Sequence, residues 1–358
     1  MSKLLRRTGY ALAALIAVGF LPPVQARVKA VPVLAESLGF QLPRPFAASV
    51  ERTEVVLDGV TGDLYSPKKP APAIVLIPGA APKGRDDPRL IRAAEAVTKT
   101  ERIVFVPQLE LTQRRFVVED IERIVRSTAA LGEREDVVGE VTLFGISYGG
   151  SFALIAAADD RLQGRLGQIA VFGAYFDLVG VVQAVTTGVS LVDGETIPFD
   201  PDPRARDVLN EVATRLVPQR ARSALTAALE GDVDRSRLPQ GARIVYDFLT
   251  NEEPERTFDL ADRLPERARR VIEEFSPSSV AGRIDAPVVA MHSTDDPVVP
   301  YGEGVRLESG LSDTRLYSVS FFRHVDLSEG EIKGGFLGAT GDFFTAWRFT
   351  SAVLSAQE

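Results

Sequence analysis

The hexapeptide Gly145-Ile146-Ser147-Tyr148-Gly149-Gly150 constrains this chain more than any other stretch. A short apolar run rich in β-formers, 141–144, precedes it, and a run with the composition of a buried helix, 151–158, follows it. Strand, Gly-x-Ser-x-Gly and helix in this order are the context of a nucleophile elbow. The serine backbone is strained in such a turn, and glycines two residues to either side remove Cβ atoms that would clash. The competing interpretation is a glycine-rich turn with an incidental serine.

Composition limits the classes of partner. A chain of 358 residues with 45% hydrophobic and 25% charged residues can form one large α/β domain with an insertion, or two domains. The net charge is −8 and no basic patch stands out, so we expect no nucleic-acid partner. Cysteine is absent, which excludes disulfides, a thiolate nucleophile and cysteine-based metal sites.

Residues 1–26 have the pattern of a targeting segment. Three basic residues precede the apolar stretch 10–21, and a small-residue site ending at Ala26 follows it. About a dozen apolar residues suit a signal peptide better than a membrane span. We expect cleavage after Ala26 and export, to the medium or to the periplasm and cell envelope. The alternatives are an uncleaved N-terminal anchor, attached to the membrane through residues 10–21, and a mis-assigned start codon.

Buried strand patterns alternate with amphipathic helical patterns along most of the chain. This alternation predicts an α/β protein with a doubly wound, mostly parallel sheet. The stretch 180–280 breaks the rhythm with acidic and arginine-rich helical patterns, and we interpret it as a helical cap inserted into a core of residues 27–179 and 281–358. The predicted parallel strands include the runs 73–77, 103–107, 141–144, 168–173, 287–291 and 315–320.

A serine hydroxyl needs a neighbouring base, and the base needs an orienting carboxylate. The chain has two histidines. We take His324, just past the last predicted strand, as the base, with a surface histidine as the competing interpretation. His292, at the end of the preceding strand, is expected to be structural.

The acid is expected on a tight turn after a strand, and Asp296 fits this position because it directly precedes Pro297. Asp295 and Asp177 remain open as alternatives. The order Ser147, Asp296, His324 is the order of α/β-hydrolases. Two backbone N–H groups should stabilise the oxyanion, one at Tyr148 and one at Ala80 in the loop after the strand 73–77.

With these elements in place, the chain resembles the α/β-hydrolase superfamily, in particular carboxylesterases, thioesterases and dienelactone-hydrolase-like enzymes. The resemblance spans about residues 54–355 without the cap, and two departures from the common pattern are Pro78 and Arg323, where many members have His and Gly. It implies a serine hydrolase acting on a small-molecule ester or thioester, with no cofactor and no metal. The rival hypotheses are a peptidase or a cofactor-free haloperoxidase-like enzyme on the same fold, and a non-catalytic binding protein. The motifs that carry the resemblance are Ile77-Pro78-Gly79-Ala80, Gly145-Ile146-Ser147-Tyr148-Gly149-Gly150, Asp295-Asp296-Pro297-Val298-Val299-Pro300 and His324.

Overall fold

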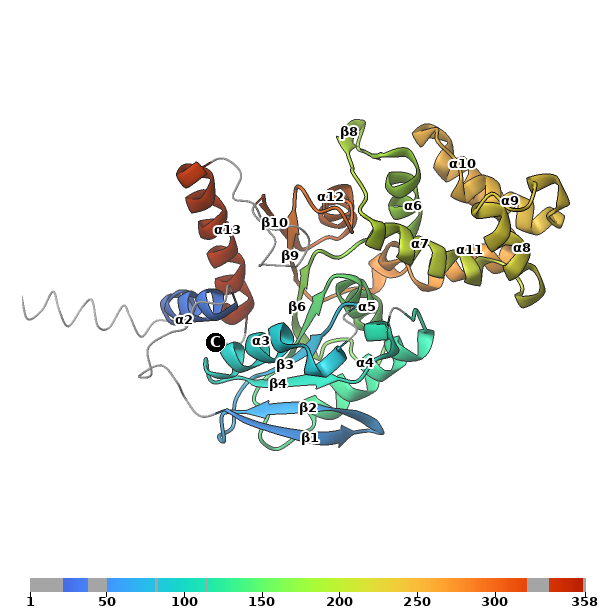
Figure 1. Cartoon of the computed structure of the whole chain (residues 1–358). Helices are drawn as coiled ribbons and strands as arrows, with labels where there is room; N and C mark the ends of the chain where they lie inside the picture. Colours follow the sequence, from blue (N-terminus) through green and yellow to red (C-terminus); the bar gives the residue numbers. More distant parts are fainter. Residues whose placement is uncertain (1–21, 38–49, 81–82, 114, 321–334, 357–358) are drawn as a thin grey trace, which may run out of the picture.

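The computed structural model describes residues 22–37, 50–80, 83–113, 115–320 and 335–356. Its centre is an eight-stranded sheet with the order β1-β2-β4-β3-β5-β6-β9-β10 (Figure 1). β2 pairs antiparallel with both β1 and β4, and every other neighbouring pair is parallel. The predicted doubly wound, mostly parallel sheet is confirmed. The strands are β1 (Glu51–Leu57), β2 (Val60–Ser66), β3 (Ala73–Ile77), β4 (Ile103–Pro107), β5 (Val141–Ile146), β6 (Leu166–Phe172), β9 (Val288–Ser293) and β10 (Thr314–Val319).

The sheet is buried on both faces because its central strands are apolar at nearly every position. In β3, Val75 and Ile77 face the core beneath α4 and α5, whereas Ile74 and Leu76 face the core beneath α2 and α3. The same alternation places Val289 of β9 against α13. The helices that pack on the sheet are α2 (Pro22–Ser37), α3 (Pro88–Thr98), α4 (Val118–Gly132), α5 (Tyr148–Ala157), α12 (Tyr301–Gly310) and α13 (Gly335–Ser355).

The chain between β6 and β9 leaves the sheet after α6 (Leu178–Thr187) and returns through a 3-10 turn, Pro277–Arg283. A separate hairpin, which the sequence patterns did not predict, lies inside this segment. Prolines at 218, 239 and 265 precede three of its helices, each at the N-cap, because proline is compatible with the start of a helix but not with its interior. The other elements of the segment are β7 (Val189–Val192), β8 (Glu195–Pro198), α7 (Pro203–Leu216), α8 (Gln219–Leu229), α9 (Gln240–Leu249), α10 (Thr257–Asp262) and α11 (Glu266–Glu274).

Helix α2 is an element that the sequence patterns did not predict. The stretch after Ala26 has little periodicity, but it is helical as far as Ser37. Ala26, Ala30 and Val33 are buried against the sheet domain, and the Trp347 indole of α13 donates to the Arg27 carbonyl at 2.8 Å. Tertiary packing therefore outweighs the helix penalty of the internal Pro32.

Residues 1–21 of the proposed targeting segment lie outside the described residues. The proposed cleavage site after Ala26 falls within α2, and no observation tests cleavage there, so it stays a prediction. Of the helices that the structure describes, none combines the length and the apolar run needed to cross a lipid bilayer.

Candidate active site

Ser147 occupies the one-residue turn between β5, which ends at Ile146, and α5, which begins at Tyr148. Its φ of 55° and ψ of −134° place a residue with a Cβ in a sparsely populated conformation, which costs about 1–3 kcal/mol. Two backbone hydrogen bonds hold the turn. The Ser147 N–H donates to the Phe172 carbonyl at 2.7 Å, and the Gly150 N–H donates to the Ser147 carbonyl at 2.8 Å.

The glycines on either side of this turn are required by close backbone contacts. A Cβ on Gly145 would lie 2.3 Å from Gly150 Cα, and a Cβ on Gly149 would lie 2.4 Å from the Pro78 carbonyl oxygen. Backbone atoms cannot give way as a flexible side chain can. The steric argument that the sequence suggested for the Gly-x-Ser-x-Gly spacing is therefore met by the geometry of the turn.

The loop after β3 approaches the serine side chain closely. A Cβ on Gly79 would lie 2.9 Å from Ser147 Cβ and 3.5 Å from Ser147 Oγ, so only glycine fits there. The next residue, Ala80, is partly buried. Tyr148, on the other side of the serine, is the first residue of α5, where backbone N–H groups have no acceptor within the helix. Of the two residues predicted to stabilise an oxyanion, Tyr148 thus follows Ser147 directly in sequence, and Ala80 follows Gly79, which lies against the Ser147 side chain.

The tyrosine side chain at 148 is fully buried. Burial raises the pKa of its phenol well above the usual range, and the nearby carboxylates of Asp296 and Asp202 raise the pKa further. The hydroxyl is therefore neutral at any physiological pH.

Asp296 and Asp295, which the sequence could not separate, have different environments. Asp296 is 4% exposed, and its Oδ1 accepts the backbone N–H groups of Val298 at 2.8 Å and Val299 at 3.0 Å. Asp295 is exposed. The turn therefore fixes the Asp296 carboxylate inside the protein at the carboxyl end of β9, which favours Asp296 over its neighbour as the orienting acid.

Asp177, the third candidate acid, has a local structural task. Its Oδ1 accepts the Val179 N–H at 2.8 Å and so caps the N-terminus of α6. Its Oδ2 accepts the Ser278 hydroxyl at 2.9 Å. Both oxygens are engaged with the start of α6 and the end of the segment that returns to β9.

The two histidines stand differently in the structure. His292 is 1% exposed at the end of β9, with Nε2 3.0 Å from the Val299 carbonyl and 3.7 Å from Asp296 Oδ2. A Cβ on Gly304 would lie 2.9 Å from His292 Nδ1, so the ring is tightly packed. His324 lies outside the described residues.

The described stretch 115–320 ends at the carboxyl edge of the sheet, the edge where Asp296 and Ser147 lie. β10 pairs parallel with β9, and Val319 lies beside Ser293. The next residue, Ser320, donates its N–H and hydroxyl to Asp342 Oδ2 at 2.9 and 2.7 Å. His324 follows four positions later in the sequence.

Glu303 is a residue at this edge that the sequence gave no reason to select. It is fully buried in α12, and its Oε2 accepts the backbone N–H groups of Phe176 at 3.1 Å and Asp177 at 2.7 Å. Burial first and the Asp177 carboxylate second raise its pKa to about 8, although Arg306, 3.2 Å away, opposes the rise. A Cβ on Gly180 would lie 2.1 Å from Glu303 Oε1. Glu303 thus holds the loop after β6 in place.

No group of three or more histidine, aspartate or glutamate side chains within the described ranges could hold a metal ion.

No protein-family model matches the chain, and no curated protein matches it in sequence. Solved structures with a similar arrangement include a membrane phospholipase A described as a bacterial virulence factor, at 17% identity and a TM-score of 0.46 over 98% of this chain and 99% of that one. A thermophilic carboxylesterase from a metagenomic library aligns at 14% identity and a TM-score of 0.45, over 95% and 99% of the two chains. The 2-hydroxy-6-oxo-6-phenylhexa-2,4-dienoate hydrolase of Rhodococcus sp. strain RHA1 aligns at 16% and 0.45, over 84% and 99%. Identities this low carry no information on reaction or substrate.

The fold itself follows from the order and direction of the strands, from helices on both faces of the sheet and from the strained serine turn between β5 and α5. The chain has the α/β-hydrolase fold.

Proposed function

We propose that the protein is a serine hydrolase that cleaves a carboxylic ester or thioester through an acyl-enzyme on Ser147. The observation that carries this proposal is the strained Ser147 turn with the Gly79–Ala80 loop packed against its side chain. The strained Ser147 backbone, which Gly79, Gly145 and Gly149 accommodate, lowers the stability of the folded protein. It is expected where a hydroxyl must be presented to a substrate rather than in an ordinary strand-to-helix connection.

In the proposed mechanism, Ser147 Oγ attacks the acyl carbon while His324 takes the hydroxyl proton. The N–H groups of Tyr148 and Ala80 stabilise the oxyanion of the tetrahedral intermediate. When the intermediate collapses, His324 returns the proton to the leaving alcohol or thiol, and the acyl group stays on Ser147. A water molecule, deprotonated by His324, then releases the carboxylic acid. Asp296 orients the imidazole and stabilises its charged form.

We further propose that the segment 180–280 acts as a cap that shapes the substrate pocket. Its attachment to the sheet edge supports this role, because the Asp202 N–H donates to the Pro297 carbonyl at 3.0 Å, next to Asp296. The Leu178 N–H also donates to Ser276 Oγ at 3.0 Å, joining the two ends of the segment. Export through the N-terminal segment, with cleavage after Ala26 or retention as an anchor, is part of the same proposal.

Labelling with a fluorophosphonate probe tests the nucleophile. We expect the wild-type protein to be labelled and Ser147→Ala to be unlabelled. Ser151→Ala is a matched control on the same helix, because the Ser151 hydroxyl is buried and donates to the Tyr175 carbonyl instead. It should still be labelled. Equal labelling of wild type and Ser147→Ala, or no labelling of either, would overturn the assignment.

A substrate panel tests the reaction class. p-Nitrophenyl esters of increasing acyl length, an acyl thioester and aminoacyl amides should be compared. Turnover of the esters or the thioester, lost in Ser147→Ala, is expected. Preferential cleavage of the amides would favour a peptidase, and halogenation with peroxide and an organic acid would favour the haloperoxidase-like alternative.

A further inference from the structure

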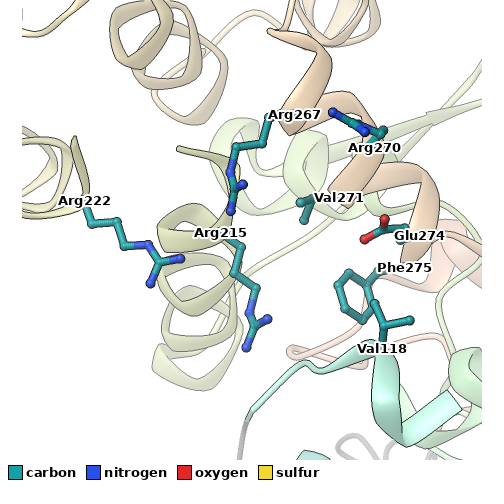
Figure 2. A pocket seen from close by; sticks show the side chains of 8 residues that line it. All are labelled: Val118, Arg215, Arg222, Arg267, Arg270, Val271, Glu274 and Phe275. Carbon is teal, nitrogen blue, oxygen red and sulfur yellow. The ribbon is translucent and has the colours of Figure 1, made fainter. Parts of the chain in front are cut away.

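Four arginines gather around one pocket on the helical segment, away from Ser147. Arg215 comes from the end of α7, Arg222 from α8, and Arg267 and Arg270 from α11. The pocket has a volume of about 340 Å³, within the range of small-ligand sites. Figure 2 shows the Arg215, Arg222 and Arg267 side chains extending into the same region. This gathering of positive charge contrasts with the chain's net charge of −8.

Few acidic residues line this arginine pocket. Glu274 is the one acidic residue among those that line it, so the lining carries three more positive than negative charges. Arg270 pairs with Glu266 at 3.5 Å, but both side chains are exposed, and such pairs contribute little. Among the described residues, no carboxylate forms a salt bridge with Arg222 or Arg267.

One donor in the pocket is both buried and unsatisfied. Arg222 Nε is shielded from solvent and has no hydrogen-bond partner in the part of the chain that the structure describes. A buried donor without an acceptor costs about 1–3 kcal/mol, and more when the group is charged. Because this atom is out of reach of solvent, a ligand in the pocket does not contact it directly. The unsatisfied donor shows instead that the described residues supply no acceptor at this atom of the Arg222 guanidinium, in keeping with the small number of acidic residues in the lining.

The remaining wall of the pocket is apolar and rigid. Phe275 is 2% exposed as a residue and stacks on Phe152 of α5 with ring centroids 5.7 Å apart. Val118, the first residue of α4, lies opposite the arginines beside Phe275 (Figure 2). An apolar wall facing a cationic one suits a ligand that has an organic body as well as an anionic group.

We infer that the arginine pocket binds a small organic phosphate. Guanidinium groups recognise phosphate oxygens through paired N–H donors, and a phosphate monoester carries up to two negative charges and three terminal oxygens. That matches a lining with an excess of three positive charges better than a single carboxylate does. The phosphoryl group contacts the arginines, and the organic body packs against Phe275 and Val118.

This site is separate from the proposed nucleophile. The Phe116 ring lies between Phe275, at 6.0 Å, and Tyr148, at 5.2 Å, so a layer of buried aromatic rings separates the pocket from the elbow. Binding therefore does not depend on Ser147, and Ser147→Ala should bind the ligand as well as wild type. This variant separates a failure of the binding proposal from a failure of the hydrolase proposal.

Isothermal titration with phenyl phosphate tests the inference. The double variant Arg222→Gln/Arg267→Gln should bind about tenfold or more weakly than wild type, because each lost charged hydrogen bond contributes appreciably. The matched control is Arg220→Gln/Arg269→Gln. It removes the same charge from positions on α8 and α11 that do not line the pocket. The control should bind within about twofold of wild type, because screened surface charges contribute little.

Three further titrations make the outcome decisive. Inorganic phosphate should bind more weakly than phenyl phosphate, and phenol should not bind measurably. Arg270→Gln alone, at an exposed position, should weaken binding by a few-fold and guards against misfolding of the double variant. Absence of phenyl phosphate binding at millimolar concentration, or equal weakening in the control, would overturn the site. Equal binding of inorganic and phenyl phosphate would overturn the part assigned to the apolar wall.

Discussion

The carboxyl edge of the sheet and the helical segment between α6 and β9 are built in different ways. At the sheet edge, backbone meets backbone. Gly145 and Gly149 admit no Cβ, and Asp296 is held by two main-chain N–H groups. In the helical segment, long side chains meet across a pocket, as Arg222 and Arg267 do. The first arrangement tolerates few substitutions and suits chemistry. The second tolerates many, and suits recognition that can change while the reaction stays the same.

The largest expected contrast lies between the two histidines. His324→Ala should lower the kcat for a p-nitrophenyl ester by about 10⁴-fold or more, because the nucleophile loses its base. His292→Gln should cost much less activity and mainly stability, since the buried His292 ring contacts the Val299 carbonyl. Steady-state kinetics and thermal melts of both variants measure this. A larger activity loss in His292→Gln than in His324→Ala would reverse the assignment of the base.

The next contrast lies between neighbouring carboxylates. Asp296→Asn should lower kcat by about 10²- to 10⁴-fold with little change in folding, because the amide oxygen can still accept the Val298 N–H but cannot stabilise an imidazolium. Asp295→Asn removes the same charge at an exposed position and should stay within about twofold. Equal losses of kcat in the two variants would mean that catalysis depends on the net charge at this edge of the sheet and not on the buried position of Asp296.

Two glycine substitutions compare the regions directly. Gly149→Ala should lower the free energy of unfolding by several kcal/mol and abolish labelling of Ser147. Its Cβ would meet the carbonyl oxygens of Pro78 at 2.4 Å and Ile77 at 2.8 Å. Gly241→Ala, in α9, should be neutral or stabilising by up to about 1 kcal/mol, because its nearest contact is Pro265 Cγ at 3.5 Å. Urea unfolding measures both. Similar destabilisation by Gly149→Ala and Gly241→Ala would mean that the backbone is not packed more closely at the sheet edge than in the helical segment.

The last comparison concerns the pH dependence of stability. The folded pKa of Glu303 is raised to about 8 from the usual 4.5, so the folded state binds the proton more tightly than the unfolded state does. Its contribution to stability therefore falls as the pH rises from about 4.5 to 8, by at most about 1.4 kcal/mol per pH unit. Glu303→Gln keeps an acceptor for Phe176 and Asp177 and cannot ionise, so its stability relative to wild type should increase over that window. Urea unfolding at pH 5, 6.5 and 8 measures the trend.

Glu266→Gln provides the matched control for the pH experiment. Glu266 lies on α11 with its side chain 77% exposed, so its replacement should leave the pH dependence unchanged. A parallel pH response in Glu303→Gln and wild type would mean that Glu303 is already ionised at neutral pH in the folded protein.

Particular residues illustrate what could be predicted. The central parallel strands, such as the runs 73–77 and 103–107, were visible as continuous apolar runs because both faces of the sheet are buried there. The serine turn was predictable from the Gly-x-Ser-x-Gly spacing, where Gly145 avoids a clash with nearby Gly150, but the contact of Gly149 with Pro78 became visible only in the fold. The hairpin of β7 and β8 was not, since four-residue strands with exposed positions give no pattern. Helix α2 was missed because Pro32 and weak periodicity conceal a helix that packing against α13 stabilises.

The sequence by itself determined the strand pattern and nominated Ser147 and His324, with Asp296, Asp295 and Asp177 as candidate acids, because those constraints are local or tied to an ordered motif. Only the tertiary structure separated Asp296 from Asp295 and Asp177, through their burial and hydrogen bonds. Only the tertiary structure brought Arg215 and Arg222 together with Arg267 and Arg270, because helical spacing connects only the last two. Steric exclusion between neighbouring residues can be predicted from the sequence. Burial, and contacts between charged residues that are distant in the sequence, are established only when the chain has folded.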